Sequence, residues 1–241
     1  MLVEPLGEVC ETLARLFFYL AVLSSQRNGG LYLTVEKTVW GGLTILFVAF
    51  FSWYTSFSGP LSDQEIDYYL EKFQEREDTT RDDIERLEKF LREDTGDDFV
   101  MVNLIEIYET PLPIEGVEEG DSSAAVLDKY MEFMWPELIK RASHPIWMGD
   151  SASKAMDLMN ADGMETWTRA AGMRYRSRRD LVEIGSNPEF AGSHAYKVAA
   201  MSKTIAFPID PWFQLGDPRI MLALILMLVG LATSLMIRRI R

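Results

Sequence analysis

The sequence predicts an α+β domain held between two membrane-spanning helices, and three observations support this prediction. Two segments contain no charged residue, residues 38–58 and residues 220–237. The stretch between them, residues 59–218, contains 33 of the 37 acidic residues and 17 of the 24 basic residues, a net charge of −16. Within this stretch, segments with the alternation of strands are interspersed with segments of helical periodicity. The chain is therefore expected to combine a folded acidic domain with two anchors.

Each uncharged segment is long enough to cross a bilayer as a helix. The segments have 21 and 18 residues, which at about 1.5 Å per residue gives lengths of roughly 27–32 Å. Aromatic residues lie near their ends, where rings are expected at the membrane interface: Trp40, Trp53, Tyr54, Trp212 and Phe213. The alternatives are a buried core helix for either segment and a cleaved signal peptide for the first, which no clean A-x-A site follows.

The basic residues that flank the segments predict the orientation. Arg15, Arg27 and Lys37 precede the first segment, and three arginines follow the second. Because Lys and Arg near span ends tend to stay in the cytoplasm, both termini are expected there. Residues 59–218 would then lie outside the cytoplasm, in the periplasm if the protein is held in the inner membrane of a Gram-negative bacterium.

The first 37 residues are expected to lie in the cytoplasm or at the membrane interface. Leu13, Leu16, Phe17, Leu20 and Leu23 share one face of a helix over residues 13–23, which suits a helix lying in the interface. A wrongly assigned start codon is an equally simple explanation. Cys10 is the single cysteine, so no internal disulfide can form.

The acidic stretch after the first segment, residues 59–97, predicts two helices. Ser62 with Glu65 forms a capping-box pattern that opens the first helix, and Thr80 begins the second. Each helix has only a narrow apolar stripe among many charged residues. This pattern favours a solvated helical stalk, with a docking surface for a partner protein as the alternative.

The remaining stretch predicts alternating strands and helices. Strands are expected at residues 99–108, 144–148, 174–184 and 203–209, and helices at residues 122–143, with a kink at Pro136, at 153–172 and from 187 to about 202. This order is the split βαβ arrangement of a ferredoxin-like fold with a helical insert. The predicted organisation is 1–37, N-terminal segment; 38–58, first span; 59–97, stalk; 98–211, ferredoxin-like domain; 212–219, interfacial linker; 220–237, second span; and 238–241, cytoplasmic tail.

Two parts of this domain carry a resemblance to a known family. They are the helix YMEFMWPELIKRA and the run RYRSRRDLVEIGSNPEFAGSHAYKVAAMSKTIAFPI. Together they resemble the small uncharacterised proteins of the dimeric α/β-barrel superfamily, in which two ferredoxin-like halves pair into one barrel. The resemblance implies that the domain pairs through its sheet. It does not select an activity, because the superfamily hosts monooxygenases, isomerases and haem-degrading proteins.

Only two histidines are candidates for acid–base chemistry. His194 lies between Phe190 and Val198 at helical spacing, so it is expected on an apolar helix face, either as a structural residue or as a pocket acid/base or haem ligand. His144 precedes Pro145 at a helix-to-strand corner. No third ligand stands at metal spacing, so no metal is expected.

An arginine-rich run provides the candidate ligand-binding residues. Strand alternation would place Arg174, Arg176 and Arg178 on one face and Tyr175 on the other. Such a face favours either anion binding or pairing with the domain's own carboxylates. Trp147 is a further candidate for a pocket wall, with core packing as the alternative. An acidic domain repels phosphate backbones, so no nucleic-acid partner is expected.

These observations favour a non-catalytic role. The expected function is an accessory or assembly subunit, anchored in lipid, that presents its domain to its own copy or to a larger membrane complex. The alternative is a small-molecule sensor or enzyme, monooxygenase- or isomerase-like, with His194 as acid/base in the barrel pocket. No cofactor is predicted, and haem is the alternative.

Overall fold

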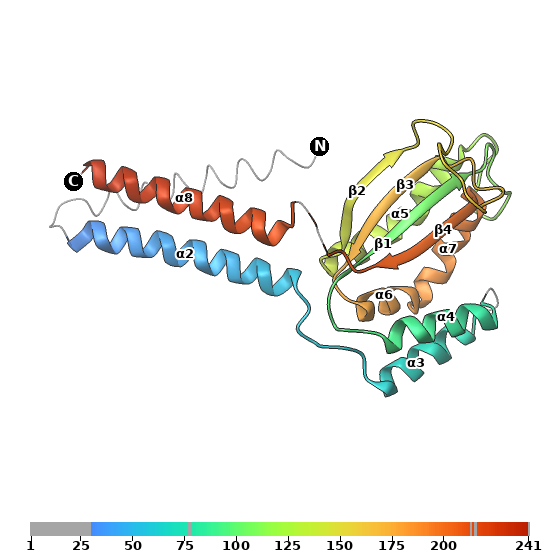
Figure 1. Ribbon diagram of the computed structural model, residues 1–241, viewed down its shortest axis with the longest axis horizontal. Helices are drawn as coiled ribbons and strands as arrows, with labels where there is room; N and C mark the ends of the chain where they lie inside the picture. Colours follow the sequence, from blue (N-terminus) through green and yellow to red (C-terminus); the bar gives the residue numbers. More distant parts are fainter. Residues whose placement is uncertain (1–29, 77–78, 213, 215, 241) are drawn as a thin grey trace. The chain divides into compact units, whose positions relative to one another are not determined.

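The computed structural model describes residues 30–76, 79–212, 214 and 216–240. The chain divides into two compact units, one of Met1–Phe51 with Leu215–Arg241 and one of Ser52–Gln214 (Figure 1). The interfacial helix expected at residues 13–23 lies outside the described residues.

The first unit contains the two apolar helices, except for the last three residues of the first, which belong to the second unit. They are α2, Gly30–Tyr54, and α8, Pro218–Ile240, so both begin before the uncharged segments, and α2 ends four residues before Ser58. Both are long and apolar enough to cross a membrane, and 0% and 11% of their most apolar windows are buried within the protein. This exposure is opposite to that of a core helix, which is mostly buried.

A tryptophan joins these two helices. The Trp40 indole lies against Gly230, where a Cβ would come within 2.5 Å of the ring. Its Nε1 donates a hydrogen bond to the Ser234 hydroxyl at 3.2 Å. Gly230 and Ser234, two small residues four apart on α8, therefore let the large ring of α2 lie close to the helix.

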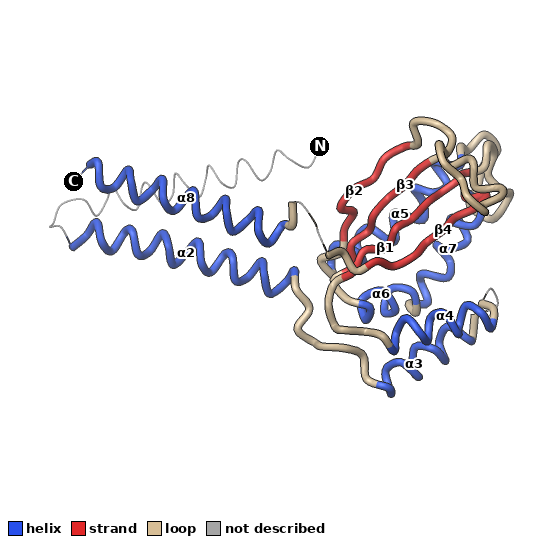
Figure 2. The backbone as a smooth tube through the Cα atoms, in the orientation of Figure 1, coloured by secondary structure: helices blue, strands red, loops and turns tan. Residues whose placement is uncertain are grey.

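The second unit is built on a four-stranded sheet. The strands are β1, Phe99–Ile107; β2, His144–Asp150; β3, Arg169–Tyr175; and β4, Met201–Ile209, in the spatial order β2-β3-β1-β4 with every neighbouring pair antiparallel. Helix α5, Ser123–Lys140, joins β1 to β2, and α7, Pro188–Ala200, precedes β4. Figure 2 shows both helices on one face of the sheet. The fold is ferredoxin-like.

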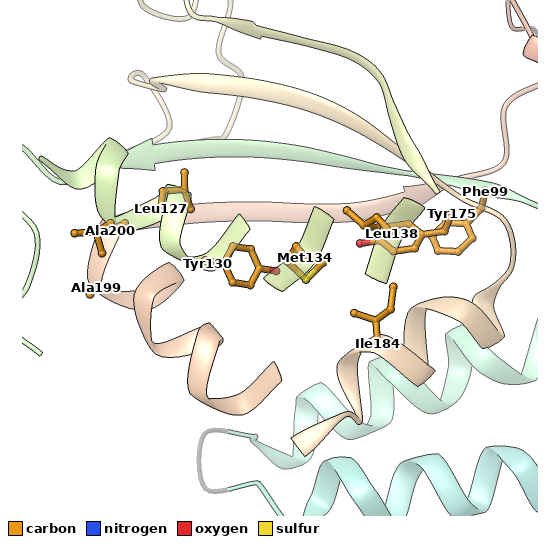
Figure 3. Packing of buried hydrophobic residues seen from close by; sticks show 10 residues of the cluster. Phe99, Leu127, Tyr130, Met134, Leu138, Tyr175, Ile184, Ala199 and Ala200 are labelled. Carbon is orange, nitrogen blue, oxygen red and sulfur yellow. The ribbon is translucent and has the colours of Figure 1, made fainter. Parts of the chain in front are cut away.

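The core lies between the sheet and these helices. Phe99 of β1 stacks on Tyr175 of β3 with ring centroids 5.4 Å apart, and Met134 and Leu138 of α5 cover them (Figure 3). Burial raises the pKa of Tyr175 to about 12. Tyr175 is thus a core residue on the helix side of the sheet.

The third strand ends earlier than its sequence predicts. The expected strand at 174–184 is wrong beyond Tyr175, because α6 occupies Arg178–Gly185. Ser177 caps this helix by accepting from the Asp180 backbone N–H at 3.1 Å, and Val182 and Ile184 are buried. A serine cap followed by an acid three residues later favours a helix start over a continued strand.

The helical insert expected at 153–172 is also wrong. Residues 153–168 contain no helix, and β3 begins at Arg169. Asn160 and Gly163 have φ values of 53° and 79°, which interrupt any helix in this segment. Met156 and Met159, which would lie on the apolar side of such a helix, are 92% and 82% exposed. The loop is closed at its base by a hydrogen bond from Ser151 N to Thr168 O.

The two helices of the acidic stretch form as predicted. They are α3, Asp63–Gln74, and α4, Arg81–Arg92, and both predicted caps form complete capping boxes. Their stripes share a small core with α6, formed by Leu61, Ile66, Leu70, Leu91 and Val182. The hairpin of α3 and α4 is therefore packed against the domain rather than solvated on all sides.

Candidate interaction face and arginine network

Four arginines surround the junction between β3 and α6. They are Arg174, Arg176, Arg178 and Arg179, and each is bonded to another part of the second unit. Only Arg174 lies in β3, because α6 begins at Arg178. The predicted strand face of three arginines is therefore not formed, and the alternative of pairing within the domain is the arrangement observed.

Arg174 is the largest fully buried side chain in the described part of the chain, with 1% of its surface exposed. Its Nε donates to Asp98 Oδ2 at 2.8 Å, its Nη1 to the Ala142 carbonyl at 2.8 Å and its Nη2 to the Tyr54 carbonyl at 2.9 Å. The guanidinium also lies 3.8 Å from the Tyr54 ring centroid. The buried cation is thus neutralised, hydrogen-bonded and covered by an aromatic face.

Tyr54 ends α2, and its carbonyl is one of the last four that a helix leaves without an internal partner. Arg174 satisfies it, and Arg176 Nη1 donates to the neighbouring Trp53 carbonyl at 3.2 Å. Arg176 in turn is held by both carboxylate oxygens of Asp180, at 2.9 and 2.7 Å. Cations at a helix C-terminus also favour the helix dipole. The two arginines therefore satisfy the carbonyls of Trp53 and Tyr54, which belong to the second unit.

Arg178 and Arg179 hold the α3–α4 hairpin. Arg178 donates to the Phe90 carbonyl, and its guanidinium lies 4.4 Å from the Phe90 ring centroid. Arg179 forms a bidentate pair with Glu65, at 3.2 and 3.0 Å. Hydrogen bonding to Arg179 is the largest cause that lowers the pKa of Glu65 to about 2, so the capping carboxylate is ionised at neutral pH.

His144 lies beside Arg174 and also contacts Tyr54. Its Nδ1 is 2.9 Å from the Pro145 carbonyl, and its Nε2 is 2.7 Å from the Tyr54 hydroxyl. A carbonyl only accepts, so Nδ1 carries a proton and donates to Pro145. Both ring nitrogens thus lie within hydrogen-bond distance of a partner.

The middle of the sheet face opposite α5 and α7 is apolar, between the row of His144 and Arg174 and the row of Glu106 and Lys203. Phe99 and Met101 point toward the helices, so strand alternation places Val102 and Leu104 on the other face. Two rows across the sheet carry no charge there: Gly172, Val102 and Phe207, then Ala170, Leu104 and Ile205. We call these six positions and Trp147 the open face.

Trp147 forms one border of the open face. Its indole lies against Gly172, where a Cβ would come within 2.4 Å of Nε1, so the glycine makes room for the ring. Trp147 is 46% exposed and Phe207 is 44% exposed. Two large aromatic side chains of the open face thus remain accessible to solvent.

His194 lies in α7, away from β3. Its ring stacks on Phe190 with centroids 5.2 Å apart, and Phe190 meets Tyr130 and Phe133 of α5 edge-on. The expected apolar face is confirmed at Phe190 but wrong at Val198, which is 54% exposed. His194 is half-buried and lies on the helix side of the sheet. His144 lies opposite Arg174 in the register of β2 and β3, at one end of the other face.

The structure thus brings His144, Arg174 and Arg176 together around the end of α2. Arg178 instead contacts Phe90 of the α3–α4 hairpin, and Tyr175 and His194 lie on the helix side of the sheet. Sequence reasoning missed Tyr54, because it belongs to an apolar segment assigned to the membrane. No group of three or more His, Cys, Asp or Glu side chains within the described ranges could hold a metal ion.

No protein-family model and no curated protein matches the chain. Among solved structures, RPA0582 from Rhodopseudomonas palustris, a protein of unknown function, is 18% identical with a TM-score of 0.46 over 57% of this chain and 97% of its own. At3g17210 from Arabidopsis thaliana is 12% identical, with a TM-score of 0.31 over 48% and 97%. SnoaB from Streptomyces nogalater, a cofactor-independent oxygenase, is 10% identical, with a TM-score of 0.30 over 50% and 99%. These similarities are too low to bear on activity or assembly.

Proposed function

We propose that the protein is a membrane-anchored assembly subunit whose domain pairs with a second copy of itself through the open face. The observation that carries this proposal is the open face, whose two rows contain no charge and whose Trp147 and Phe207 side chains are exposed. Helices α2 and α8 are the anchors, and both termini lie in the cytoplasm. Residues 59–218 lie outside it, at the plasma membrane or the bacterial inner membrane.

Charge favours a copy of this chain as the occupant of the open face. The stretch 59–218 has a net charge of −16, so two copies repel one another through most of their surfaces. The open face has no charged side chain in its two rows, which are Gly172, Val102 and Phe207, and Ala170, Leu104 and Ile205. Two such faces can therefore meet without burying a carboxylate, and each buries the other's exposed aromatic rings.

The pairing is tested by placing a carboxylate on the open face. The dimer of the full-length Phe207→Glu protein in mild detergent is expected to have a dissociation constant at least ten times that of the wild-type dimer. The reason is that its interface would bury an unpaired charge. Light scattering with the detergent mass subtracted measures the molecular mass across a dilution series.

Val198→Glu is the matched control, since Val198 is an exposed apolar residue of α7 on the other side of the sheet. This variant is expected to remain dimeric. A monomeric wild-type protein, or a Phe207→Glu protein with unchanged mass at every dilution, contradicts the proposal.

The topology is tested separately. In a Cys10→Ser background, the Ser122→Cys variant, changed at the start of α5, is expected to react with an impermeant maleimide while the cytoplasmic membrane is intact and any outer membrane is permeabilised. The reason is that residues 59–218 lie outside the cytoplasm. A cysteine at Arg241 is expected to react only after the membrane is broken. The reverse pattern contradicts the topology.

A further inference from the structure

We propose that the loop between β2 and β3 binds one soft monovalent cation, Cu(I) or Ag(I), through the thioether sulfurs of Met156, Met159 and Met164. We call this loop, residues 151–168, the methionine loop. It joins the end of β2 to the start of β3 (Figure 1). It shares no residue with the open face, and the proposed pairing does not depend on it.

Two of these methionines are exposed to an extent that packing does not explain. Met156 and Met159 are 92% and 82% exposed, whereas Met134 in the core is 5% exposed. A methionine normally fills a gap in the core, because burial of its apolar side chain is favourable. Met156 and Met159 instead present their thioethers to solvent, where an ion can reach them.

A backbone hydrogen bond closes the methionine loop around the three side chains. Ala155 N donates to Glu165 O at 2.8 Å, so Met156 and Met164 each lie one residue inside this bond. The Cα atoms of a bonded pair are about 5 Å apart and successive Cα atoms about 3.8 Å apart, so those of Met156 and Met164 are separated by no more than about 13 Å. Two extended methionine side chains can meet at one ion across this distance.

The chain reverses its direction between Met159 and Met164. Asn160 and Gly163 have φ values of 53° and 79°, and Met164 N donates to the Ala161 carbonyl at 3.2 Å. Met159 therefore precedes the turn and Met164 follows it. The three thioethers belong to one short closed segment rather than to separate surfaces of the domain.

Trp167 and Lys203 fix the end of this segment. The Trp167 Nε1 donates to the Met164 carbonyl at 2.9 Å. The Lys203 ammonium donates to the Gly163 carbonyl at 2.6 Å and lies 4.6 Å from the centroid of the Trp167 ring. Residues 163 and 164 are thus tied to β3 and β4, so one of the three sulfur ligands is attached to a positioned backbone.

The donors define the class of cation. Thioether sulfur is a soft ligand that selects Cu(I) over hard cations, which prefer oxygen ligands. Residues 154–165 contain one lysine and three acidic residues, a net charge of −2. Neutral thioethers leave this charge in place, so the segment attracts a cation while its sulfurs discriminate between soft and hard ions.

The test uses the full-length Cys10→Ser protein in mild detergent, which has no thiol to compete for the metal. Silver nitrate in chloride-free buffer is the probe, and sodium nitrate and zinc nitrate are the comparison salts. A methionine-selective oxaziridine labels exposed thioethers, and peptide mass spectrometry measures the rate at each methionine. Ag(I) is expected to slow the labelling of Met156 and Met159 by about fivefold or more, because a sulfur bound to the ion no longer reacts.

Met148 is the internal control for this labelling, since it is 53% exposed in β2 and lies outside the methionine loop. Its labelling rate is expected to stay the same in all three salts. Equal protection by Zn(II) would contradict the soft class of the ligand. Labelling of Met156 and Met159 that does not change in Ag(I) would overturn the proposal.

Replacing the three methionines with leucine, Met156→Leu with Met159→Leu and Met164→Leu, keeps apolar side chains of similar size and removes the sulfurs. Titration of Ag(I), followed by calorimetry, is expected to show one site in the Cys10→Ser protein that the triple variant binds at least about ten times more weakly. Met148→Leu is the matched control and is expected to keep the site. Equal Ag(I) affinity in the Cys10→Ser protein and the triple variant would show that the methionine loop is not the site.

Discussion

Replacing Arg174 with methionine is expected to lower the free energy of unfolding of the domain by about 3–5 kcal/mol, because the change breaks a buried, hydrogen-bonded charge pair by removing one partner. The Asp98 carboxylate loses its hydrogen bond from Arg174 Nε at 2.8 Å, and the carbonyls of Ala142 and Tyr54 lose the hydrogen bonds from Nη1 and Nη2. Methionine fills much of the volume of the side chain but donates no hydrogen bond. Urea unfolding of the full-length protein in mild detergent, followed by near-UV circular dichroism, measures the change.

Arg169→Met is the matched control for this substitution. Arg169 also lies in β3 and also pairs with an aspartate, Asp150, but the two side chains are 37% and 73% exposed. An exposed pair of this kind contributes about 0–1 kcal/mol. Arg174→Lys is expected to fall between the two, since lysine keeps the charge but not the planar fork. A loss below 1 kcal/mol for Arg174→Met would contradict a structural role for the arginine.

The second large effect is expected at Gly96, between α4 and β1. Gly96 has a φ of 83°, and a Cβ there would lie 2.6 Å from the backbone carbon of Gly59 and 2.8 Å from the nitrogen of Pro60. Gly96→Ala must therefore push two backbone segments apart as well as adopt a left-handed conformation. Its expected cost is about 3 kcal/mol or more, from overpacking together with backbone strain.

Gly120→Ala separates these two contributions. Gly120 has a φ of 94°, but no atom lies within 4 Å of the position of its Cβ. Only the strain of the left-handed backbone applies to Gly120→Ala. The free energy of unfolding is therefore expected to fall by about 1 kcal/mol in the same urea experiment. Equal losses at Gly96 and Gly120 would show that the approach of Gly59 to Gly96 does not constrain the junction.

Local patterns predicted much of the fold because their causes are local. The capping boxes at Ser62 and Thr80 place a hydroxyl and a carboxylate three residues apart, and each satisfies backbone groups within its own first turn. Strand β4 and helix α7 also lie close to their expected positions, since Asn187 and Pro188 provide a cap and a first-turn proline.

Local patterns failed where two structures compete for the same residues. Residues 174–184 combine β-branched and long side chains that suit a strand. The cap at Ser177 and the packing of Val182 against α3 and α4 nevertheless stabilise a helix there. Residues 153–172 contain apolar side chains at helical spacing, but Met156 and Met159 find no partner surface and remain exposed.

The two apolar segments, the acidic stretch between them and most of the elements of a ferredoxin-like domain could be predicted from the sequence. These features depend on composition and on neighbours within a few residues. The directions of the arginine side chains depend on the tertiary structure. Arg174 and Arg179 bind carbonyls at Tyr54 and Gly59, each 120 residues away in sequence. Every residue has a backbone carbonyl, so no side-chain pattern marks the ones that a buried guanidinium will select, and only the folded chain brings these groups together.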